Sequence, residues 1–70
     1  MDGYEKLRKE IAHLEKLIRL NEKRIARLDM LIANAQTESM MKLLRNDHDY
    51  AVDEWYTNYE RLLMLISILE

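Results

Sequence analysis

Two short segments that contain histidine are the first candidates for chemistry. Glu10 and His13 have the Glu-x-x-His spacing that di-metal carboxylate bundles use on their helices. Such a site needs a second motif facing the same interior, and the second half of the chain has none. Asp47, His48 and Asp49 offer two carboxylates and an imidazole, but consecutive residues on a helix do not point toward one ion. We therefore predict no metal site at either segment.

The rest of the sequence lacks the groups on which catalysis and cofactor binding commonly depend. The 70 residues include no cysteine, which excludes disulfides and thiolate metal sites, and only one glycine, so no phosphate-binding loop can form. No nucleophile stands beside a recognisable base. We expect a protein that is not an enzyme and binds no cofactor.

A basic stretch and a group of aromatic residues form a second candidate, because such side chains together can bind nucleic acid. The residues are Lys16, Arg19, Lys23, Arg24 and Arg27 in the first half, and Tyr50, Trp55, Tyr56 and Tyr59 in the second. The two groups lie in different halves of a chain whose formal net charge is -2. We expect nucleic acid not to be the partner, and keep a nucleic-acid-associated helical dimer as the alternative function.

The elements that must position these residues are helices, because the chain has no proline and is rich in strong helix formers. In the first half, apolar residues recur in steps of three and four, as on one edge of a coiled-coil helix. This stripe comprises Tyr4, Leu7, Ile11, Leu14, Ile18, Ile25, Leu28 and Ile32, with Asn21 as its one polar member. We predict a helix over about residues 3–34, with Asp2 and Glu5 as its capping box.

A similar stripe in the second half predicts another helix, over about residues 38–69. It comprises Met41, Leu44, His48, Val52, Trp55, Tyr59, Leu62, Ile66 and Leu69. Partners in an antiparallel pair have residue numbers with a constant sum, and these two stripes pair with a sum of 73 except at Leu28, which meets Arg45 with Leu44 beside it. The turn then falls at about 35–38, where Asn34 can adopt the left-handed conformation and Thr37 or Ser39 can cap the next helix. A turn at residues 46–49 is the alternative layout.

The fold class is therefore all-α, a single domain over residues 1–70 that forms an antiparallel, coiled-coil-like two-helix hairpin. Apolar residues beside the two stripes exceed what one partner helix can bury. These interface candidates are Leu17, Leu31, Leu44, Tyr56, Leu63, Leu65 and Ile68. We expect a homodimer that forms a four-helix bundle, with a different protein partner as the alternative. Asn21, opposite Val52, and His48, opposite Ile25, are the candidate specificity residues.

Two families share limited features with the chain. Segments 7–11, 42–44 and 60–62 resemble the opening helices of the all-helical chorismate mutases. That resemblance implies that Arg8 and Lys42 contact substrate carboxylates, but the polar site residues of the family are replaced here by Ala51, Glu54 and Trp55. The size and layout are also similar to the helical-hairpin co-chaperones of type III secretion needle subunits. Neither resemblance assigns the chain to a family.

The function that these expectations favour is a non-enzymatic protein–protein interaction module, such as a small chaperone, adaptor or inhibitor. It would act through a hydrophobic helical surface. A designed or engineered helical bundle without a natural function is a further alternative. The chain begins without the basic and apolar segments of a signal peptide and has no apolar run of the roughly 18 residues that a membrane span needs. We expect a soluble, cytoplasmic protein with no membrane association.

Overall fold

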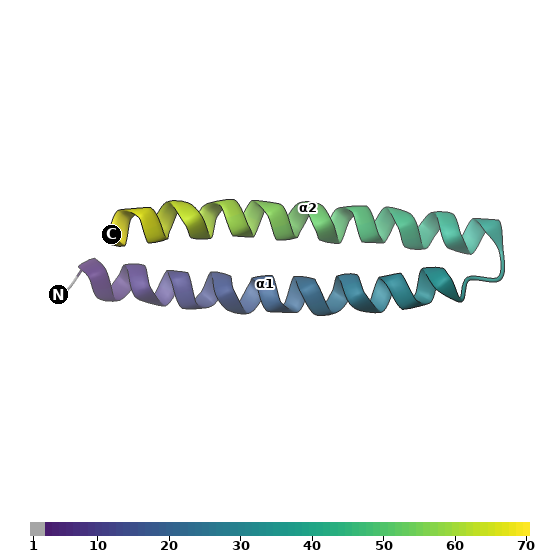
Figure 1. The fold of residues 1–70 in the computed structure, drawn as a ribbon, viewed down its shortest axis with the longest axis horizontal. Coiled ribbons are helices and arrows are strands. Elements are labelled where there is room, and N and C mark those ends of the chain that lie inside the picture. Colours follow the sequence, from purple (N-terminus) through teal and green to yellow (C-terminus); the bar gives the residue numbers. More distant parts are fainter. Residues whose placement is uncertain (1–2) are drawn as a thin grey trace.

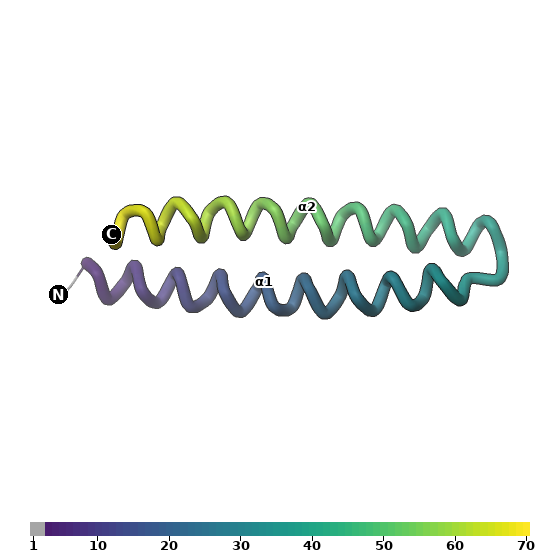
Figure 2. Tube along the Cα trace, viewed as in Figure 1, coloured from purple at the N-terminus to yellow at the C-terminus, as the bar shows by residue number. Residues whose placement is uncertain are grey.

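The computed structural model describes residues 3–70 and shows two long antiparallel helices joined by a short turn (Figure 1). Helix α1 spans Gly3–Ala33 and helix α2 spans Glu38–Leu69. The predicted all-α hairpin is confirmed, and residues 46–49 lie inside α2, so the alternative turn is not present. The two helices run side by side over their full length, as the Cα trace in Figure 2 shows.

The molecule is a rod that measures 55 × 16 × 14 Å. Its radius of gyration is 16.1 Å, whereas a compact domain of this length would have one of about 11 Å. Each helix therefore has one neighbour only, and most of its circumference faces outward. No helix within the described residues is long and apolar enough to cross a bilayer.

The turn is closed by Asn34, although not in the way that the sequence predicts. The side-chain Nδ2 of Asn34 donates a hydrogen bond to the carbonyl oxygen of Met30 at 2.8 Å. No described residue has a positive φ, so the expected left-handed conformation at Asn34 is wrong. The side-chain amide instead adds a second hydrogen bond to the Met30 carbonyl, which also accepts from the backbone N–H of Asn34 at 3.2 Å.

The first turn of α2 is held by Thr37, one of the two predicted caps. Thr37 has an extended backbone, with φ −125° and ψ 153°, and its Oγ1 accepts a hydrogen bond from the backbone N–H of Met40 at 3.1 Å. Glu38 adds a negative charge to the same turn, where the helix dipole favours it. The predicted cap of α1, Asp2, lies outside the described residues.

The core of the hairpin is thin and centred on one cluster. Leu14, Ile18 and Leu62 are buried together, and half-buried residues pack around them: Ile11, Leu17, Trp55, Leu65 and Ile66. Among the described residues no large side chain is completely enclosed. This follows from geometry, because two helices can surround a side chain on only part of its surface.

Helix α2 presents a slightly different edge to α1 than the predicted stripe. Ala51 is completely buried, whereas Tyr59, which the sequence stripe places in the contact, is 38% exposed. Val52 and Asn58 are both half-buried. In the middle of α2 the contact therefore follows Ala51, Trp55, Asn58 and Leu62. This is a small rotation of α2 about its axis, because the predicted stripe is otherwise buried or half-buried along the whole helix.

Candidate functional site

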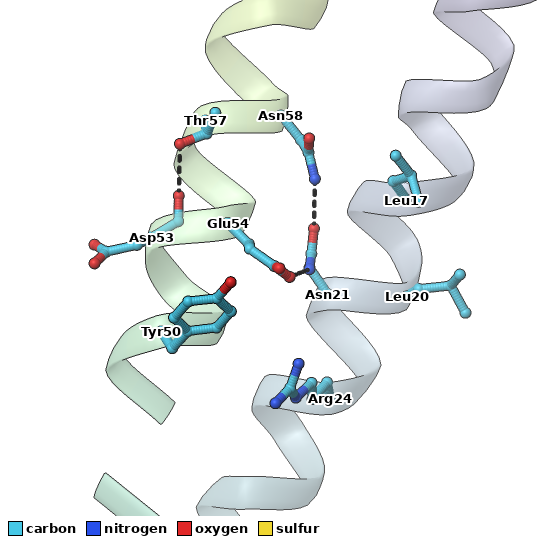
Figure 3. A pocket seen from close by; sticks show the side chains of 9 residues that line it. All are labelled: Leu17, Leu20, Asn21, Arg24, Tyr50, Asp53, Glu54, Thr57 and Asn58. Carbon is cyan, nitrogen blue, oxygen red and sulfur yellow. Dashed lines mark hydrogen bonds between the residues drawn. The ribbon is translucent and has the colours of Figure 1, made fainter. Parts of the chain in front are cut away.

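A polar cluster interrupts the apolar contact between the helices near the middle of the rod (Figure 3). Asn21 of α1 is 7% exposed and uses both ends of its side-chain amide. Its Nδ2 donates to Oε2 of Glu54 at 3.1 Å, and its Oδ1 accepts from Nδ2 of Asn58 at 2.9 Å. Asn21 is thus not opposite Val52, as the predicted register has it, but opposite two polar residues one turn apart on α2.

This arrangement explains the rotation of α2. A buried amide without partners costs about 1–3 kcal/mol, so a register that places Asn21 against Val52 would be penalised. Presenting Glu54 and Asn58 to Asn21 removes that penalty and brings Ala51 into the contact. The sequence prediction did not include these partners. The available signal is that a buried amide requires polar groups on the facing helix, and Glu54 and Asn58, four positions apart, provide them.

An open groove of about 600 Å³ runs along the hairpin on the side of the polar cluster. The polar cluster is on its floor, and Arg24 of α1 and Tyr50 of α2 lie at its walls (Figure 3). The remaining lining residues are Leu17, Leu20, Asp53 and Thr57. The groove therefore combines leucine side chains with one cation and two carboxylates.

Apolar residues continue the sides of this groove toward both ends of the rod. Residues seven or fourteen positions apart lie on nearly the same side of a helix, so Leu43 and Met64 share the side of Tyr50 and Thr57. We call this side the groove face, and define it by Leu17, Leu20, Leu31, Met40, Leu43, Tyr50, Met64 and Ile68. All of these except Leu17 are exposed.

The opposite side of the hairpin carries a cluster of aromatic rings. The Trp55 ring is stacked on Tyr59, with centroids 4.9 Å apart, and meets Tyr56 edge to face at 5.1 Å. Trp55 and Tyr56 also line a second groove, of about 330 Å³. We call this side the aromatic face and define it by Val52, Trp55, Tyr56, Tyr59 and Leu63. The aromatic rings here pack on one another, which leaves a smaller apolar area for a partner.

The predicted interface residues divide between these faces and the contact between the helices. Leu17, Leu31 and Ile68 belong to the groove face, and Tyr56 and Leu63 belong to the aromatic face. The other two predicted residues, Leu44 and Leu65, are half-buried. One partner surface could not contact the whole predicted set at once.

The histidine segments are used in contacts between the helices. His48 is half-buried in the contact between the helices, and its Nε2 lies 2.8 Å from Oδ1 of Asp29 on α1. Glu10 accepts hydrogen bonds from Nη2 of Arg61 at 2.6 Å and from its Nε at 3.3 Å. Among residues 3–70, no three His, Asp or Glu side chains lie close enough together to hold a metal ion.

Most of the basic stretch of α1 lies on one side of the helix, because Lys16, Arg19, Lys23 and Arg27 follow one another in steps of three and four. All five of its residues are exposed. Arg24 lines the groove together with Asp53 and Glu54, so part of its positive charge is offset by neighbouring carboxylates.

The fold and its surfaces define a helical hairpin with a thin core and two partly apolar faces. Comparison of the chain with protein-family models, with curated proteins and with solved structures gives no match. The function must therefore be argued from the two faces and their chemistry.

Proposed function

We propose that the chain is a non-enzymatic protein–protein interaction module that binds helical protein surfaces through its groove face. The observation that supports this is the imbalance between buried and exposed apolar residues. Among residues 3–70, five hydrophobic side chains are buried, whereas twelve large ones are exposed. Contiguous apolar surface of this kind on a small protein is typical of a binding site for another protein.

The groove face is the better of the two candidate faces because it carries more of that exposed surface. Seven of the twelve exposed residues belong to it: Leu20, Leu31, Met40, Leu43, Tyr50, Met64 and Ile68. The aromatic face carries three, Tyr56, Tyr59 and Leu63. Methionines on the groove face add adaptability, because their unbranched side chains fill irregular gaps.

The groove face has the shape and length to accept helices. It follows two antiparallel helices of 31 and 32 residues, and a helix laid along it could place residues at intervals of three and four against both. Leu43 and Met64 are 67% and 68% exposed. Burying either side chain against a partner contributes on the order of 1 kcal/mol to the free energy of binding. This mode of action suits a small chaperone, an adaptor or an inhibitor.

A photo-cross-linking experiment tests the proposal. Benzoylphenylalanine is placed at position 43 on the groove face or at position 16, which heptad spacing puts on the outer side of α1. After irradiation in cells that naturally express the chain, position 43 is expected to form covalent protein adducts and position 16 is not. Equal yields at the two positions, or no adduct at position 43, would refute the proposal.

A further inference from the structure

We propose that the occupant of the groove face is a second copy of the same chain, and that the two hairpins lie face to face with their turns at the same end. The inference rests on the proposed function and specifies its partner. It is argued from the exposed area of the chain and from the distribution of charge between its helices.

The hairpin exposes more surface than a compact protein of the same mass. The accessible surface is 5886 Å² for a chain of 8.5 kDa, whereas a compact monomer of this mass exposes about 4,700 Å². The excess is about 1,200 Å² per chain, or about 2,400 Å² for two. Homodimer interfaces that support folding bury about 2,000–5,000 Å² in total. The excess surface of two chains lies within this range, so an interface with a second copy is large enough to bury it.

The two helices of the hairpin carry net charges of opposite sign, so one copy is complementary in charge to another. Residues 4–34 include eight basic and five acidic residues, a balance of +3, and residues 37–70 include three basic and seven acidic, a balance of −4. The α1 side of the rod is therefore positive and the α2 side is negative. A second copy can place an oppositely charged helix beside each helix of the first, because it also has one positive and one negative helix.

Charge also selects the orientation of the second copy. In a two-fold dimer with the turns at the same end, each α1 lies beside the α2 of the other copy, so every neighbouring pair of helices has opposite net charge. In the dimer with turns at opposite ends, α1 faces α1 and α2 faces α2. Arg24 already lies level with Asp53 and Glu54 along the rod, so the same-end arrangement brings the same two carboxylates of the other copy to its level.

The choice of face is tested by sedimentation of the purified chain and of two matched double variants. The groove variant, Leu43→Gln with Met64→Gln, and the aromatic variant, Tyr56→Gln with Leu63→Gln, both replace exposed residues of α2 without changing charge. We expect the wild type and the aromatic variant to sediment as dimers at about 100 µM. The dissociation constant of the dimer should be at least about tenfold higher for the groove variant. Circular dichroism checks that both variants remain helical.

The orientation is tested with one introduced thiol, which is unambiguous because the sequence has no cysteine. Gln36→Cys places a thiol in the turn, whose residue 36 is exposed. With turns at the same end, mild oxidation is expected to link the dimer quantitatively. With turns at opposite ends of a rod 55 Å long, the two thiols cannot meet within one dimer.

Each outcome decides a different part of the inference. A wild-type monomer at about 100 µM would overturn the second copy as occupant, and adducts with other proteins at position 43 would then leave the proposed function standing. Dissociation of the aromatic variant instead of the groove variant would overturn the choice of face. A dimer that Gln36→Cys does not link would overturn the orientation.

Discussion

Asn21 joins the two helices by two side-chain hydrogen bonds, and replacing it with alanine should destabilise the hairpin. Asn21→Ala removes a bond to the Glu54 carboxylate, of the kind that contributes about 1.5–3 kcal/mol, and a bond to Asn58, of the kind that contributes about 0.5–1.5 kcal/mol. Both partners are half-buried and can bind water through the groove once Asn21 is gone. We therefore expect the lower end of the sum, a loss of about 2 kcal/mol in the free energy of unfolding.

A matched control is needed because alanine is itself a better helix former than asparagine, by about 0.6 kcal/mol. Asn46→Ala makes the same change at an exposed position within α2. The difference between the two variants therefore isolates the hydrogen bonds and the burial of Asn21. For a chain of this length a loss of 2 kcal/mol lowers Tm by about 8–16 °C.

Urea unfolding followed by circular dichroism and by Trp55 fluorescence measures both variants. A double-mutant cycle of Asn21→Ala with Glu54→Ala should give a coupling energy above about 0.5 kcal/mol, as residues in one hydrogen-bond network do. If the coupling energy is zero within error, the polar cluster does not form in solution. The structural account of the register would then be wrong.

Three further variants test other features of the hairpin. Thr37→Ala should lower the free energy of unfolding by about 1 kcal/mol in urea titrations, because it removes the cap of α2, and Thr37→Asp should restore most of it. Asn34→Gly should destabilise the hairpin in the same assay, because no left-handed residue needs glycine there and the bond to Met30 is lost. A stabilising effect would refute that reading of the turn. Arg61→Ala should cost less than about 1 kcal/mol, with a smaller loss in high salt, because the ion pair with Glu10 is largely exposed.

The sequence predicts α1 and the hairpin well because their determinants are local and redundant. The stripe of α1 repeats from Tyr4 to Ile32 with Asn21 as its one polar member, so the residues of α1 that face the partner helix can be identified without knowing that helix. Thr37 and Asn34 mark the turn by their capping chemistry. The conformation of Asn34 was not predicted, because asparagine can end a helix in two ways. Its backbone can adopt the left-handed conformation, or its side-chain amide can donate to a carbonyl of the last turn, as it does here to Met30.

The inner edge of α2 could not be fixed by hydrophobicity alone. Val52 and Tyr59 are more apolar than Ala51 and Asn58, so a stripe chosen by hydropathy selects the first pair. The structure selects the second, because the buried amide of Asn21 needs Glu54 and Asn58 as partners. One polar residue on α1 thus explains which residues of α2 lie in the contact near the middle of the rod.

The rotation of α2 also decides which apolar residues remain outside, and so links the polar cluster to the proposed association. With Glu54 and Asn58 turned toward Asn21, Tyr50 lines the groove, and Leu43 and Met64, seven and fourteen positions from it, lie on the same side of α2. A second copy on this face would exclude water from the floor of the groove, where hydrogen bonds contribute more than they do in contact with solvent. The loss caused by Asn21→Ala should therefore grow with protein concentration as the dimer forms. If it is the same in dilute and concentrated samples, the polar cluster and the interface are independent.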